Sequence, residues 1–162
     1  MSGLFVFIVQ FSIIAYAVIG GVFLAFSDFI MRSLARTSGT GGVEAMQVIN
    51  REVFRWVFMA LFLGLAPVSL GITLFGLIQI GGGTGTVLAA AGLTYAVGCF
   101  GVTVLYNVPL NERLAKMNLA DQSTMVFWQE TYLPQWTWWN SVRGSACILA
   151  AALLLSSLPQ LA

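Results

Sequence analysis

The placement of charge around four long apolar segments constrains this chain more than any other feature. Of its 162 residues 59% are hydrophobic and 8% are charged, whereas an ordinary globular chain is about 25% charged. A water-soluble fold of this length could not hide so much apolar surface, so lipid must act as solvent for most of it. We therefore predict an all-α fold: an integral membrane bundle of four transmembrane helices with short cytoplasmic helical connections.

Four stretches are long enough to cross a bilayer, which takes roughly 20 mainly apolar residues. The first run opens near the N-terminus, but no Lys or Arg precedes Arg32, so we expect a retained transmembrane helix and not a signal peptide. A glycine-rich turn at 81–85 separates the second and third runs. We predict one membrane domain over residues 1–162, with spans at about 4–26, 53–80, 86–106 and 141–158.

All seven Lys and Arg residues lie around the first and third connections, and the stretch between the second and third spans carries no charge. Under the positive-inside rule both connections with Lys and Arg are cytoplasmic. The sequence therefore predicts a multi-pass protein of the cell (inner) membrane, N-out and C-out, whose main partner is the lipid bilayer.

Helical segments and prolines alternate in the two cytoplasmic connections. We expect Asp28–Leu34 to extend the first helix and Val43–Glu52 to form a helix that enters the second span. Pro109 is predicted to end or bend the third helix near Asn107, and Pro134 to break the helix before the fourth span, because proline lacks an N–H donor and clashes with the preceding turn.

Composition excludes several classes of function. A net charge of +1 gives no nucleic-acid-binding field. His is absent, and Cys99 and Cys147 both lie inside apolar runs, so we expect no metal site, no other cofactor and no structural disulfide. Without His, a Ser-His-Asp or Cys-His catalytic set is also impossible.

The polar side chains that could act on a ligand converge on the predicted cytoplasmic ends of the spans. Amide and guanidinium donors ringed by aromatic side chains suit a flat, partly polar aromatic ligand, and could stabilise its anion. The expected catalytic contacts are Arg143, Asn111 and Asn140. The expected ligand-binding residues are Gln47, Asn50, Asn107, Tyr132, Trp136, Trp139 and Ser27.

Arg143 lies about one turn inside the fourth span, where a lone guanidinium is costly unless it snorkels, pairs or faces water. We expect it to face inward, with Glu52, Glu112 or Glu130 as its partner. Trp and Tyr also gather at membrane interfaces in any bundle, so an aromatic belt is the competing interpretation of the tryptophan cluster.

Several motifs give the chain a family resemblance over essentially its whole length. The chain resembles the anthrone oxygenase-like family of four-helix integral membrane proteins, a domain of unknown function family. The motifs that carry the resemblance are Gly21-Val22-Phe23-Leu24-Ala25-Phe26-Ser27, Met46-Gln47-Val48-Ile49-Asn50, Asn107-Val108-Pro109-Leu110-Asn111 and the stretch from Trp128 to Arg143.

The resemblance implies oxygenation of an anthrone to an anthraquinone without a metal or flavin. An anthrone ionises readily and its carbanion reacts with oxygen directly, so the protein need only bind it, remove a proton and stabilise the anion. One hypothesis is thus a cofactor-independent oxygenase, or a binder of a lipophilic phenol or quinone, with Glu52 or Glu130 as base. The alternative is a non-catalytic membrane subunit or interaction protein, whose polar clusters fix its own loops or dock a partner. The sequence leaves open whether the protein is an enzyme.

Overall fold

The computed structural model describes residues 2–55 and 57–161. Met1, Trp56 and Ala162 belong to the predicted domain, and Trp56 to the predicted second span, but all three lie outside the described residues. Helices joined by short turns make up the described chain. They are α1 (Gly3–Ala25), α2 (Met31–Ala35), α3 (Gly41–Glu52), α4 (Val57–Phe75), α5 (Gly82–Tyr95), α6 (Val108–Ala115), α7 (Gln122–Phe127) and α8 (Leu133–Leu161).

These helices join into longer rods, four of which are long and apolar enough to cross a membrane: Gly3–Ala35, Val57–Ile80, Gly82–Ala115 and Gln122–Leu161. Hydropathy thus predicted the fold class correctly. Each of these rods passes through at least one π-helical turn. Three of them continue well beyond the length of a span, into the part of the molecule that holds the charged residues.

The third helix does not end at Pro109, and the predicted break at Pro134 is wrong. The third rod runs on through Pro109 to Ala115, and the fourth runs through Pro134. The residue before each proline donates its backbone N–H five residues back, from Val108 to Thr103 and from Leu133 to Trp128. This wider π-helical turn gives the proline ring room, so the chain continues where an α-helical turn would clash.

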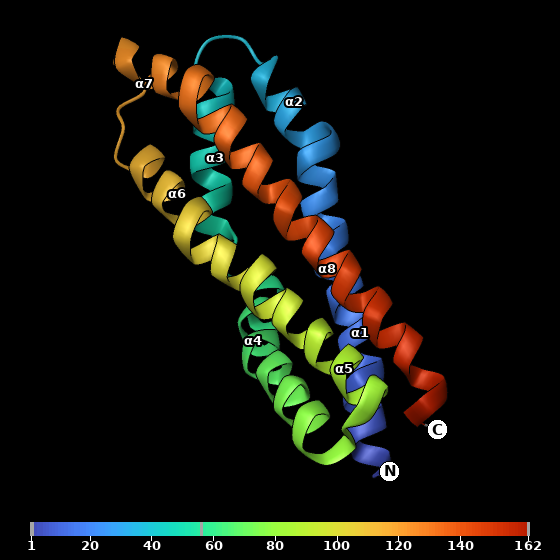
Figure 1. Ribbon diagram of the computed structural model, residues 1–162. Helices are drawn as coiled ribbons and strands as arrows, with labels where there is room; N and C mark the ends of the chain where they lie inside the picture. The colour runs from blue at the N-terminus through green and yellow to red at the C-terminus, as the bar shows by residue number, and fades with distance from the viewer. Residues whose placement is uncertain (1, 56, 162) are drawn as a thin grey trace.

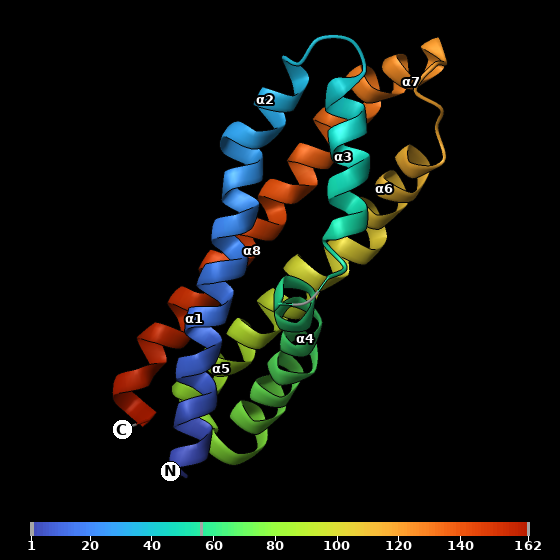
Figure 2. The same ribbon diagram turned by 180° about the vertical axis from the view of Figure 1, so that it is seen from behind.

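The predicted entry of the 43–52 helix into the second span is also wrong. α3 ends at Glu52, a turn follows, and α4 begins at Val57. Figures 1 and 2 show α3 beside the upper part of the molecule and α4 beside the lower part, so this rod alone is interrupted where the other three pass through.

Both termini and the hairpin between α4 and α5 lie at one end of the elongated molecule, and α2, α3, α6 and α7 lie at the other (Figure 1). In the lower half α1 packs along α8, α8 along α5, and α5 along α4. Close approach depends on glycine: a side chain at Gly92 would overlap the Ser69 backbone and the Thr73 hydroxyl of α4. The positions of the termini and the hairpin agree with four crossings of a membrane.

Two apolar cores are stacked along the long axis. The lower core lies between α1, α4, α5 and α8, where the rings of Tyr16 and Tyr95 stack at 4.7 Å. The Tyr16 and Ser69 hydroxyls hydrogen-bond at 2.6 Å, and the Tyr95 hydroxyl donates to the Phe62 carbonyl. The upper core joins the extensions of the rods to α3 and α6, and consists of Met31, Val43, Met46, Leu114, Phe127, Trp128, Tyr132 and Trp136.

Candidate functional site

A cavity of about 220 Å³ lies between the two cores, at the level where α3 ends and α4 begins. Its surface is mostly apolar and contains many aromatic rings, with a few polar side chains among them. The aromatic side chains that line it are Phe23, Phe26, Phe54, Phe58, Phe62, Phe100 and Trp136. The polar ones are Asn50, Thr103, Asn111, Asn140 and Arg143. Five of the ten predicted site residues therefore meet in one cavity: Asn50, Asn111, Trp136, Asn140 and Arg143.

Arg143 faces inward as predicted and is only 5% exposed. Its Nη2 donates to the Asn140 Oδ1 at 2.7 Å and its Nη1 to the Thr103 hydroxyl at 3.2 Å. The guanidinium carbon lies 4.3 Å from the centre of the Phe23 ring and 5.3 Å from that of Trp136. Its Nε has no hydrogen-bond partner among the described residues.

The predicted carboxylate partner of Arg143 is wrong. Glu52 pairs instead with Arg55 at 3.0 Å, the one ion pair between described side chains, and both side chains are exposed. Glu112 and Glu130 are exposed and line no part of the cavity. All three acids remain hydrated because water solvates a carboxylate better than this apolar cavity can.

Arg143 is thus a buried cation whose neighbours are neutral. Hydrogen bonds and the negative faces of aromatic rings hold such a charge, but they do not cancel it. An uncompensated guanidinium in an aromatic cavity attracts an anion more strongly than it would in water, because the surrounding dielectric is low. The cavity is therefore suited to a planar ligand with a negatively charged oxygen.

Asn140 positions the guanidinium. Its Nδ2 donates to the Phe23 carbonyl at 2.6 Å and to the Ser27 hydroxyl at 2.7 Å, which leaves Oδ1 to accept from Arg143. Ser27 also accepts a hydrogen bond from Ser141 and is not among the lining residues of the cavity. Ser27 was predicted to contact a ligand, but in the structure it holds the Asn140 side chain instead.

Asn111 joins two aromatic residues of the upper core to the cavity. Its Oδ1 accepts from the Tyr132 hydroxyl and from the Trp136 Nε1, both at 2.8 Å. Asn50 donates to the Tyr132 hydroxyl at 3.3 Å. With Oδ1 occupied, the Asn111 Nδ2 makes no hydrogen bond to a described residue, so it can donate to a ligand.

The other predicted ligand contacts lie outside the cavity. Gln47 donates from α3 to the Leu114 and Met117 carbonyls, at 2.8 and 3.1 Å, and so holds α3 against the end of α6. Asn107 donates to the Trp136 carbonyl at 3.2 Å. Tyr132 is fully buried in the upper core, and Trp139 stacks on Tyr106 with ring centres 3.7 Å apart. These four residues connect helices.

Sequence reasoning missed several lining residues, above all Thr103, the hydroxyl partner of Arg143. Thr103 lies four residues before Asn107, and so one helical turn deeper on the same side of the third rod. Phe54, Phe58 and Phe62 are also spaced by four residues, which is typical of one aromatic stripe on a helix. Both spacings were available signals.

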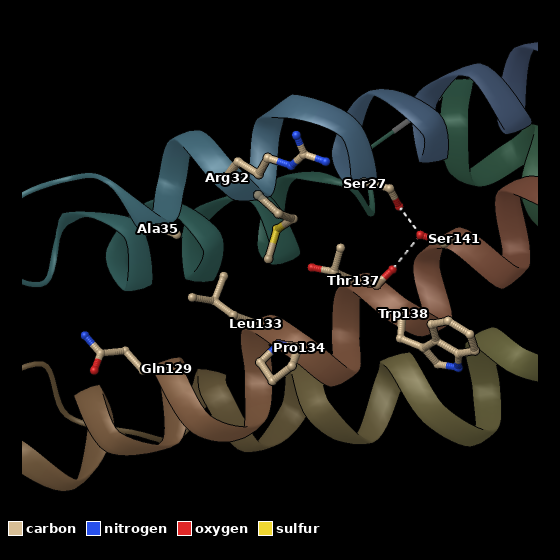
Figure 3. A pocket seen from close by; sticks show the side chains of 10 residues that line it. Ser27, Arg32, Ala35, Gln129, Leu133, Pro134, Thr137, Trp138 and Ser141 are labelled. Atoms are coloured by element: carbon tan, nitrogen blue, oxygen red, sulfur yellow. Dashed lines mark hydrogen bonds between the residues drawn. The ribbon is translucent and has the colours of Figure 1, made fainter.

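A second hollow lies on the outer surface between α2 and the first turns of α8. It has a volume of about 610 Å³, and Figure 3 shows Arg32, Gln129, Thr137 and Trp138 around it. The Ser141 hydroxyl lies 2.9 Å from both the Ser27 hydroxyl and the Thr137 carbonyl oxygen, within hydrogen-bond distance of each. Ser27 thus lies between this groove and the Asn140 side chain of the buried cavity.

The fold and the cavity define a class of protein: a four-helix membrane protein with an aromatic cavity around a buried arginine. A family model described as Anthrone oxygenase matches residues 51–153. This region is more than half of the chain, so the protein belongs to the anthrone oxygenase family, as its sequence motifs had predicted. It includes Asn111, Asn140 and Arg143, whereas Asn50 and Ser27 fall before it. No curated protein and no solved structure matches the chain.

Proposed function

We propose that the protein binds a lipophilic phenol, quinol or anthrone-like ketone in the cavity and stabilises its anion. The observation that carries this proposal is the burial of Arg143 among aromatic rings, with no carboxylate of a described residue beside it. A ligand oxyanion beside the guanidinium would supply the missing negative charge, and Asn111 Nδ2 would add a neutral donor.

The same arrangement supports oxygenation without a cofactor. An anthrone that loses a proton from its methylene carbon becomes an enolate, whose oxygen would face Arg143. Addition of molecular oxygen at that carbon, followed by loss of water, turns the CH₂ group into a carbonyl. One anthrone and one O₂ thereby give one anthraquinone and one H₂O, and no outside reductant is needed.

The predicted base is not supported by the positions of the two candidates. Neither Glu52 nor Glu130 lines the cavity, so the contribution of the protein is to lower the pKa of the substrate and not to offer a carboxylate. Asn50 is the polar lining residue on α3 and hydrogen-bonds to the Tyr132 hydroxyl. Neither the Asn50 amide nor the Tyr132 hydroxyl is a base near neutral pH, so the proton would be taken up by water or hydroxide from solution.

We place the protein in the cell (inner) membrane with its charged end on the cytoplasmic side. The N-terminus, the C-terminus and the glycine-rich hairpin are then outside. Support comes from the positive-inside rule and from the positions of both termini and the hairpin at the opposite end (Figure 2). The cavity then lies at the cytoplasmic end of the spans.

A non-catalytic membrane subunit is the second candidate. It is favoured by the four predicted site residues that connect helices, of which Gln47 is the clearest example because it bonds two backbone carbonyls. Under this alternative Arg143 and Asn111 would serve the same structural purpose.

The test is oxidation of anthrone by the purified protein in lipid nanodiscs. The reaction is monitored by oxygen uptake and by quinone absorbance. We expect Arg143→Ala to lower kcat by about 10²–10³, the effect of removing one oxyanion donor, and Asn111→Ala to lower it less. Arg36→Ala is the matched control, because Arg36 is exposed and remote from the cavity lining.

Folded variants that retain full turnover would contradict the oxygenase proposal. Loss of the fold in both variants would favour the structural alternative.

A further inference from the structure

We infer that the ligand enters the cavity laterally from the bilayer. It enters as a neutral phenol or ketone dissolved in the lipid, and it loses its proton only after it reaches Arg143. This inference rests on the proposed function and adds the route and the form of the substrate.

The cavity has an apolar opening on the lipid-facing side. Leu63 of α4 and Val104 of the third rod both line it, yet they are 51% and 49% exposed on the outer surface of the molecule. Val22 of α1 also lines it and is 36% exposed. Each of these residues belongs to a rod that is apolar enough to cross a membrane. All three also lie within the predicted spans 4–26, 53–80 and 86–106, so we expect hydrocarbon, and not water, to surround the opening.

The upper core closes the cavity toward the charged end. Met46 and Trp136 line the cavity and are themselves buried, with Trp128 and Tyr132 packed behind them. The rings of Tyr132 and Trp136 stack with centres 6.2 Å apart, and both side chains bond to Asn111. An aromatic molecule cannot pass through this packed, hydrogen-bonded layer without taking the core apart.

The lower core closes the opposite end. Phe62 lines the cavity and packs on Phe100 with ring centres 5.6 Å apart. Below them lie the stacked rings of Tyr16 and Tyr95, both without exposed surface. With both ends closed, the opening lies on the side of the molecule, where Leu63, Val104 and Phe54 are exposed lining residues. Phe54 is 70% exposed and lies on the turn after α3.

This geometry selects the form of the substrate. A charged molecule would have to cross hydrocarbon to reach the opening, which is costly, whereas a neutral phenol or ketone partitions into it. Once inside, the molecule meets the guanidinium, which favours loss of its proton. Size agrees as well: benzene occupies a cavity of about 150 Å³ in another protein. About 220 Å³ therefore holds two fused rings, and a third ring would extend through the opening.

The experiment measures association and dissociation of 1-naphthol with the protein in nanodiscs by stopped-flow fluorescence of the naphthol. Val104→Phe narrows the opening, and Leu105→Phe is its control, because Leu105 is 68% exposed on the next position and lines no part of the cavity. Leu63→Phe and Leu70→Phe form a second pair on α4.

We expect the on-rate and off-rate to fall together by about tenfold in Val104→Phe and Leu63→Phe, as for a narrowed gate, with both controls close to wild type. We also expect the permanently charged 1-naphthol-4-sulfonate to fail to bind.

Equal rates in lining and control variants, or equal binding of the sulfonate, would overturn the lateral route while leaving the proposed function intact. Failure of the wild type to bind 1-naphthol at all would overturn the proposed function, and the route with it.

Discussion

Replacing Arg143 by methionine separates a ligand-binding arginine from a structural one. Methionine keeps an unbranched side chain but removes the charge and all donors. The variant loses the hydrogen bonds to Asn140 and Thr103 and the contact with the Phe23 ring. Together these are worth about 5 kcal/mol.

A second contribution acts in the opposite direction. The variant no longer has to bury an unpaired guanidinium, which costs several kcal/mol even after the protein relaxes. The two contributions are similar, so we expect the free energy of unfolding to change by less than about 2 kcal/mol. Unfolding by SDS in mixed micelles, followed by circular dichroism, measures this.

Binding should respond much more strongly than stability. A charge-assisted pair between a guanidinium and an oxyanion contributes about 3 kcal/mol, so Arg143→Met is expected to weaken 1-naphthol binding by about a hundredfold. 1-Methoxynaphthalene has nearly the same shape but cannot ionise, and its affinity should stay within about threefold. Equal losses for both ligands, or a variant that unfolds, would refute the reasoning.

Other predictions concern packing, helix connections and topology. Gly92→Ala places a methyl group against the Ser69 backbone and is expected to destabilise the fold by about 1–3 kcal/mol; Gly64→Ala, whose new methyl group meets nothing within 4 Å, should be neutral or slightly stabilising in the same SDS titration. Gln47→Leu removes the two hydrogen bonds from α3 to Leu114 and Met117 and is expected to cost about 1–3 kcal/mol while 1-naphthol affinity stays unchanged in a fluorescence titration. A matching loss of affinity would make Gln47 a ligand contact after all. Under the proposed orientation, Gly83→Cys should react with an impermeant maleimide on intact cells, and Ser38→Cys only after lysis. The native Cys99 and Cys147 are buried, so we expect no labelling from them. The reverse pattern would invert the proposed orientation.

Hydropathy was sufficient to predict four helices long and apolar enough to cross a membrane, because it follows from transferring side chains into lipid and needs no tertiary information. Helix ends were harder. The sequence predicts an end or bend at Pro109 and a break at Pro134, since the π-helical turn that accommodates each proline depends on packing around it. The turn after Glu52 was missed because apolar residues resume directly after it, at Val53 and Phe54.

Part of the candidate site was predictable because polar side chains in apolar helices avoid lipid and face the interior of the bundle. Asn140 and Arg143 meet as their spacing implies. The carboxylate expected beside Arg143 was wrong, because pairing was weighed without the cost of burying an acid. Tyr132 and Trp139 could not be sorted into lining and support from spacing alone, since both lie beside aromatic partners.

The interruption of a single rod between α3 and α4 has a mechanical consequence. Three rods run past the cavity without such a turn, so we expect its walls to keep their separation whether or not a ligand is bound. A ligand then finds donors and rings already in place, and little of its binding energy is spent on ordering the protein. Such a rigid cavity also selects ligands by shape. A larger ligand could be accommodated only if the short turn after Glu52 moved.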